Sequence, residues 1–167
     1  MGRSFNAARF PMGTAPNTLA IAPTAGQTFK IHALVVLDGN GTLVECGANP
    51  AKVLGVSGNA AFIGYGLNLA DTTASTIITG SGFKSQAVSV MVADRETIFS
   101  CRGINGATDP LTPTLAMKGV KYGVAKVGND WVLNQADTTN VVVQVVDVEI
   151  SNKVFFVKFL ESVLNLA

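Results

Sequence analysis

The sequence predicts an all-β fold, a small sandwich or barrel of about eight to ten short antiparallel strands with an extended N-terminal arm. Valine, isoleucine and phenylalanine dominate many short stretches, which is typical of strands. Turn signals rich in glycine, asparagine and aspartate separate these stretches, and no long window has apolar residues at helical spacing. The length of 167 residues suits one domain.

The strongest strand signal runs from residue 140 to residue 159. It reads NVVVQVVDVEI, then Ser151-Asn152, then KVFFVKF, which predicts two strands joined by a tight turn. Alternation with Asp147 and Glu149 from Val146 onward predicts one wet face there, with Val146 on the apolar face. Much of the hairpin is apolar on both faces, so we expect it to be central and covered by its own curled sheet or by another chain.

Residues 1–27 are expected to form the arm. Pro11, Pro16 and Pro23 disfavour a long regular element, and large apolar residues are scattered. Aromatic and arginine side chains on such an arm can be anchors that order on binding, and an ordinary frayed terminus is the alternative. The candidate anchors are Arg3, Phe5, Arg9 and Phe10.

Residues 28–167 are expected to form the β-rich body, in which Asp38-Gly-Asn-Gly41 is a clear hairpin turn. Gly55 marks a bulge or a close contact, and residues 115–118 suit one helical turn. A stretch rich in glycine, alanine and threonine at 58–82 is expected to be a surface excursion that meets a partner. Further strands are predicted at 28–37, 42–46, 52–57, 86–93, 96–101, 120–127 and 131–133, with a loop at 103–115.

The composition favours assembly with other proteins. The chain is 48% hydrophobic and only 14% charged, against roughly 25% charged residues in ordinary soluble domains. We therefore expect part of its surface to be covered by protein. The net charge of +1 gives no reason to expect nucleic acid or a membrane surface as a partner, and we expect neither a secretory signal peptide nor a transmembrane span.

No residue pattern indicates catalysis, so we expect no enzyme, no catalytic residue, no metal site and no cofactor. The single histidine, His32, lies among apolar residues and is expected to be structural. Cys46 and Cys101 are expected to be buried thiols, although a bridge between them stays open. The sequence from Gly55 to Asn59 lacks the second glycine of a nucleophile elbow.

Three segments, in order, resemble small phage capsid decoration (cement) proteins. The first is IHALVVLDGNGTLVECGANPAKVLGVS at 31–57, and the second is AVSVMVADRETIFSC at 87–101. The third spans 119–160, where a Gly-x-x-Tyr-Gly strand, a tight turn into Trp131 and a final x-Val-x-Phe strand follow one another. The residues before Thr28 and the excursion at 58–82 are not covered by the resemblance.

The resemblance implies a homotrimer on the outer capsid surface of the virion, made in the host bacterial cytoplasm and bound to the major capsid protein. In this interpretation the arm contacts the capsid or a neighbouring subunit, and its removal abolishes capsid binding but leaves a folded body. The last hairpin would help to form the trimer through Val143, Val145, Phe155 and Val157.

Two other functions remain open. One is another virion structural protein, a tail or baseplate component that forms rings. The other is a carbohydrate-binding module that uses Trp131 with Tyr65 or Tyr122, although a lone tryptophan is more often a core or interface anchor.

Overall fold

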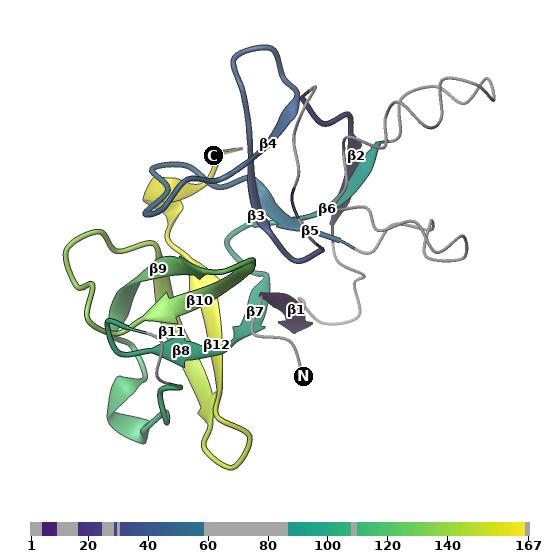
Figure 1. Cartoon of the computed structure of the whole chain (residues 1–167). Coiled ribbons are helices and arrows are strands. Elements are labelled where there is room, and N and C mark those ends of the chain that lie inside the picture. The colour runs from purple at the N-terminus through teal and green to yellow at the C-terminus, as the bar shows by residue number, and fades with distance from the viewer. Residues whose placement is uncertain are drawn as a thin grey trace.

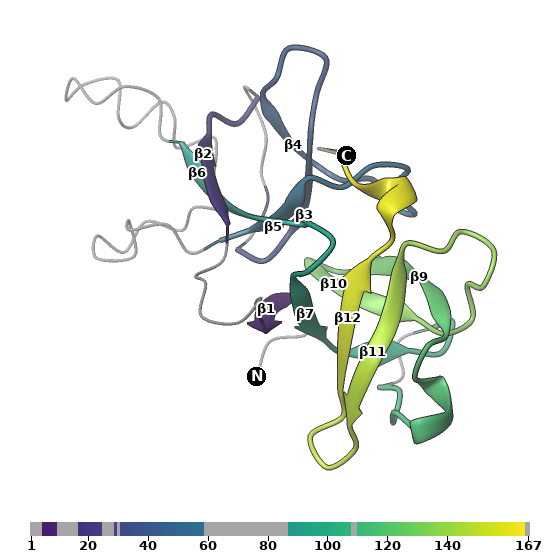
Figure 2. The same cartoon turned by 180° about the vertical axis from the view of Figure 1, so that it is seen from behind.

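The computed structural model describes residues 5–9, 17–24, 29, 31–58, 87–107 and 110–165, of which 6–9 are described as backbone. The strands in these residues form a seven-stranded and a five-stranded sheet, so the all-β prediction is confirmed (Figures 1 and 2). The helical elements described are two short 3-10 turns, η3 (Leu115–Met117) and η4 (Glu161–Val163).

The seven-stranded sheet closes into a barrel. Its order is β1 (Asn6–Arg9), β7 (Ile98–Cys101), β12 (Val154–Phe159), β11 (Val143–Glu149), β9 (Lys121–Val127), β10 (Asp130–Asn134), β8 (Gly103–Ile104). Only Arg102 separates β7 from β8 along the chain, yet β7 pairs with β12 while β8 pairs with β10 in parallel. The amide of Leu133 donates to the Arg102 carbonyl at 2.9 Å, which completes the ring.

The five-stranded sheet also curls until its edges meet. Its order is β2 (Thr18–Ile21), β6 (Val88–Val92), β5 (Gly55–Ser57), β3 (Leu34–Leu37), β4 (Leu43–Glu45). Directly after β2, the Ala22 carbonyl accepts from the Leu43 amide, and the Thr24 amide donates to the Leu43 carbonyl, both at 2.9 Å. The segment after β2 therefore pairs with β4, at the opposite edge of the sheet.

Alternating apolar residues build the interior, as expected for strands with one buried face. In β6, Val88, Val90 and Val92 are buried while the residues between them are half-buried. In β12, Phe155, Val157 and Phe159 are buried in the same way. The β6 pattern follows the alternation in the sequence, whereas β12 has apolar residues in succession and only the structure shows which of them are buried. Strands β11 and β12 form the central hairpin that was predicted.

One hydrophobic core joins the two barrels. The buried cluster includes Leu34, Val56 and Val90 from the five-stranded sheet and Trp131 and Phe155 from the other. A single core across both sheets means that the described residues form one folded unit.

The predicted separate arm is wrong for the segments that the structure describes. Residues 6–9 pair with β7, and residues 18–21 pair with β6, so both are strands of the body's own sheets. At four residues each, these segments are too short to give a strong strand signal, and pairing with existing strands determines their structure. The excursion at 58–82 lies outside the described residues beyond Gly58.

Two further differences concern element boundaries. The strand predicted at 28–37 begins only at Leu34, because Ile31 and His32 form a turn in which His32 has a positive φ of 70°. The loop predicted at 103–115 begins with the two-residue strand β8. The helical turn predicted at 115–118 is confirmed as η3.

Candidate interaction surface

The four residues predicted to form a trimer interface lie in the core of the single chain. Their exposed fractions are 0% for Val143, 1% for Val145, and 0% for Phe155 and Val157. The barrel itself covers this face of the hairpin, so these side chains have no surface to offer to a second chain. Their assignment to an oligomer interface is therefore wrong for this conformation.

The candidate anchors of the arm are only partly described. Phe5 is fully buried, and its ring stacks on Phe159 with 5.6 Å between ring centroids, so it packs into the chain's own core and not against a capsid. The backbone of Arg9 belongs to β1. Arg3 and Phe10 lie outside the described residues.

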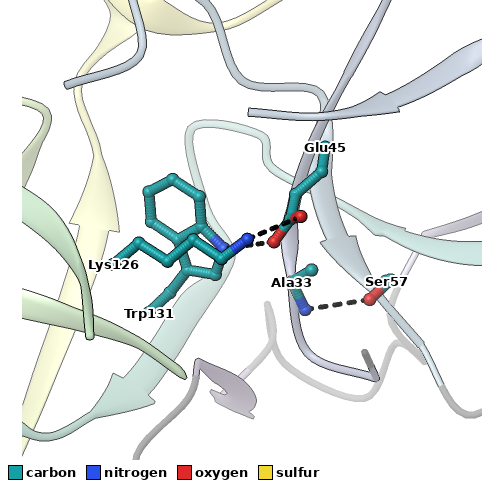
Figure 3. Close-up of polar contacts among 5 residues, drawn as sticks. All are labelled: Ala33, Glu45, Ser57, Lys126 and Trp131. Carbon is teal, nitrogen blue, oxygen red and sulfur yellow. Dashed lines mark hydrogen bonds and ion pairs between the residues drawn. The ribbon is translucent and has the colours of Figure 1, made fainter. Parts of the chain in front are cut away.

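Trp131 is a core residue at the junction of the two barrels. It is 0% exposed, and its indole nitrogen Nε1 donates to Glu45 Oε1 at 3.1 Å, while Lys126 Nζ lies 2.8 Å from Glu45 Oε2 (Figure 3). A buried indole cannot stack on a sugar, so Trp131 is not a carbohydrate platform. Tyr122 is only 6% exposed, and Tyr65 lies outside the described residues.

Further polar contacts connect the segment between β4 and β5 to the larger barrel and to the segment after β12. With its side-chain amide oriented so that the nitrogen faces the acceptors, Asn49 donates to Asp137 Oδ2 and to the Val124 carbonyl at 3.1 Å each. The Val53 amide donates to the Val163 carbonyl at 2.7 Å, and the Asn165 amide donates back to the Val53 carbonyl at 2.9 Å. The junction is thus held by backbone and side-chain hydrogen bonds as well as by the shared core.

The titratable side chains described here show no reactive arrangement. Burial lowers the pKa of His32, which favours its neutral form. Cys46 and Cys101 are free and buried; burial raises the pKa of Cys46 to about 12 and also raises the pKa of Cys101. Both thiols are therefore weak nucleophiles, as expected for small core residues. Within the described part of the chain, no three His, Cys, Asp or Glu side chains gather as they would around a metal ion.

A shallow depression lies where β12 ends. It is lined by Arg95, Gln144, Lys158, Phe159, Leu160 and Glu161. Arg95 Nε lies 3.2 Å from Glu161 Oε1, and both side chains are about two-thirds exposed. Three of the six lining side chains are charged and the ion pair is largely exposed, so this depression differs from the mostly apolar, enclosed pocket of a typical small-molecule site.

The most distinctive surface surrounds a β-bulge in β11. Val145 pairs with Val157 and Asp147 pairs with Phe156, so Val146 is the extra residue of the bulge. The bulge turns Val146 outward, to 37% exposure, and leaves Val148 packed against the core. The alternation in the sequence predicted Val146 and Val148 on one face, and the bulge separates them.

Two more exposed apolar residues belong to the elements beside this bulge. Val120 is 37% exposed, and its carbonyl accepts from the Val145 amide at 3.0 Å; Leu115 is 65% exposed and lies in η3, which is close to β11 (Figure 2). We call Leu115, Val120 and Val146 the bulge patch. Their sequence neighbourhoods contain no pattern of exposed anchors, so only the bulge and the packing of η3 identify them.

The loop that carries Val120 is fixed to β11 by several bonds. The Gly119 amide donates to the Val145 carbonyl at 2.8 Å, and Gln144 Nε2 donates to the Gly119 carbonyl at 2.9 Å. Lys118 Nζ lies 2.7 Å from Asp147 Oδ1. Val120 is therefore held beside β11, and the residues of the bulge patch lie on elements that also carry the Lys118–Asp147 ion pair. Exposed apolar residues with charged groups nearby are common in protein interfaces.

Comparison with protein-family models, with curated proteins and with solved structures found no match. No helix in the described residues is long and apolar enough to span a membrane.

Proposed function

We propose that this protein is a virion structural protein, a capsid decoration (cement) protein that binds the outer surface of a phage capsid as a homotrimer. The proposal rests on the resemblance of three segments of the sequence to such proteins. The structural observation that best supports it is the bulge patch, three exposed apolar residues on neighbouring elements of the seven-stranded barrel. The low content of charged residues supports it as well.

The mechanism of such a protein is thermodynamic linkage. A protein that binds the expanded shell and not the unexpanded or disrupted shell stabilises the expanded state by its binding free energy. Many copies bind one shell, so small free energies add up. A patch on elements that are already folded suits this role because little conformational entropy is lost on docking.

Shell binding is tested with expanded capsids that were assembled without this protein, taken from the phage that encodes it. We expect the chain to co-sediment with these shells and to raise their disruption temperature, and we expect Val146→Asp to lower the affinity at least tenfold. Leu19→Asp is the matched control, since Leu19 is also 37% exposed but lies in β2 of the other barrel. A wild-type chain that fails to bind expanded shells would overturn the proposal.

Native mass spectrometry addresses the oligomeric state. A trimer has a mass of about 52 kDa, three times the chain mass of 17.3 kDa. A sixfold ring without shell binding would favour the alternative, a tail or baseplate component.

A further inference from the structure

Among the described strands of the seven-stranded sheet, β1 is the one that lies outside the closed ring of the barrel (Figure 1). It pairs antiparallel with β7, with Asn6 opposite Ser100, Ala7 opposite Phe99 and, after an irregularity, Arg9 opposite Ile98. The other edge of β7 is occupied by β12. Among the strands that the structure describes, β1 is thus paired with β7 alone.

Phe5 provides the side-chain anchor of this strand. It is 0% exposed, it stacks on Phe159, and Phe159 in turn meets the ring of Phe99 edge to face at 5.3 Å. The barrel therefore binds this extended segment in two ways, by strand pairing along the edge of β7 and by burying the Phe5 ring against Phe159. This combination is how proteins bind peptides by strand addition.

We propose that the β7 edge and the buried position of the Phe5 ring form a strand-acceptor site, and that in the assembled protein this site binds residues 5–9 of a second copy. Residues 5–9 are the segment that fits this site, because in the structure they occupy it in a defined register. The backbone bonds and the aromatic contact are the same whether the strand comes from the same chain or from another, so exchange costs little free energy. Exchange would join copies without using the core residues of the central hairpin.

The inference concerns contacts between copies and does not depend on binding to a shell. Two single-cysteine changes in the full-length chain test it, Asn6→Cys and Ser100→Cys, which place thiols on directly paired positions. The double variant is concentrated until native mass spectrometry detects the oligomer, and it is then oxidised with oxidised glutathione. Denaturing gels separate covalent oligomers from monomers with an internal disulfide.

We expect most of the double variant to form covalent oligomers, and a mixture of the two single variants to form a covalent dimer. The matched control is Thr18→Cys with Met91→Cys across β2 and β6, which we expect to link only within one chain. A Phe5→Ala change in the double variant should lower the covalent oligomer at least threefold. Purely internal disulfides, absence of any disulfide, or a chain that stays monomeric at every concentration would each overturn strand exchange, whatever the result of shell binding.

Discussion

At the residue scale, Asp38 organises the clearest turn in the chain. Its Oδ1 accepts from the amides of Asn40 at 2.8 Å and Thr42 at 2.9 Å, and its Oδ2 accepts from the hydroxyls of Thr24 and Thr42 at 2.8 Å each. These bonds close the hairpin between β3 and β4 and attach the segment after β2. They favour the charged carboxylate and lower the pKa of Asp38 to about 2, with the Thr42 amide as the largest cause.

This lowered pKa predicts a pH-dependent contribution to stability. The unfolded chain holds Asp38 at an ordinary pKa near about 4, so the stabilisation is fully present above that pH and is lost as the pH falls toward about 2. Asp38→Asn should unfold at lower urea than wild type at pH 6, and the difference should shrink between pH 4 and pH 2. A difference that stays constant over this window would contradict the assignment, because other carboxylates titrate equally in both proteins.

At the element scale, Gly55 sets the distance between β5 and β6. A Cβ at this position would lie 2.1 Å from the carbonyl oxygen of Met91, which is backbone and cannot turn away. The sequence identified Gly55 as a bulge or close contact, and the close contact is confirmed.

We expect Gly55→Ala to destabilise the fold by about 3 kcal/mol or more, because the strand pair must separate to admit the methyl group. Gly47→Ala is the control, since a Cβ there has no atom within 4 Å. The control should change the free energy of unfolding by less than about 0.5 kcal/mol. Equal urea midpoints for the two variants would show that β5 and β6 are not packed as described.

Strands with regular alternation could be predicted from the sequence, and so could turns with strong glycine and asparagine signals. Alternation identified β6, a run of successive apolar residues identified β12, and the Asp38 turn identified the hairpin of β3 and β4. The bulge at Val146 could not be predicted, since an extra residue has no signature in a run of valines. Nor could β1 and β8, which are too short for periodicity and depend on strands already in place.

At the scale of the whole molecule, the sequence was compatible with either a sandwich or a barrel. Two features of the strand connectivity show that each sheet closes into a barrel. Ring closure depends on which strand reaches which edge, through Arg102 in one barrel and through Ala22 and Thr24 in the other. The candidate interaction surface could not be predicted from the sequence either, since the exposure of Leu115 and Val120 depends on how η3 packs. The residues of the central hairpin that were predicted to form an interface instead lie in the interior of the barrel.

At the polar junction between the barrels, we expect substitutions of Glu45 and of Lys126 to lower the stability by different amounts. Glu45→Ala leaves the fully buried indole nitrogen of Trp131 without this acceptor, which should cost about 1–3 kcal/mol. Lys126→Ala removes only a partly exposed ion pair and should cost less than about 1 kcal/mol. Urea unfolding should remain a single transition for both variants, because one core spans the barrels. A larger loss for Lys126→Ala would contradict this order.

The order of strands in the larger barrel has a consequence for synthesis on the ribosome. Strands β11 and β12 lie between β7 and β9, yet they are translated after both. Until residue 159 has left the exit tunnel, the apolar faces of β7, β9 and β10 have no central hairpin to cover them. The nascent chain must therefore carry β7, and later β9 and β10, without the hairpin until the last part of its translation. A cell that makes many copies would rely on chaperones to keep such chains apart.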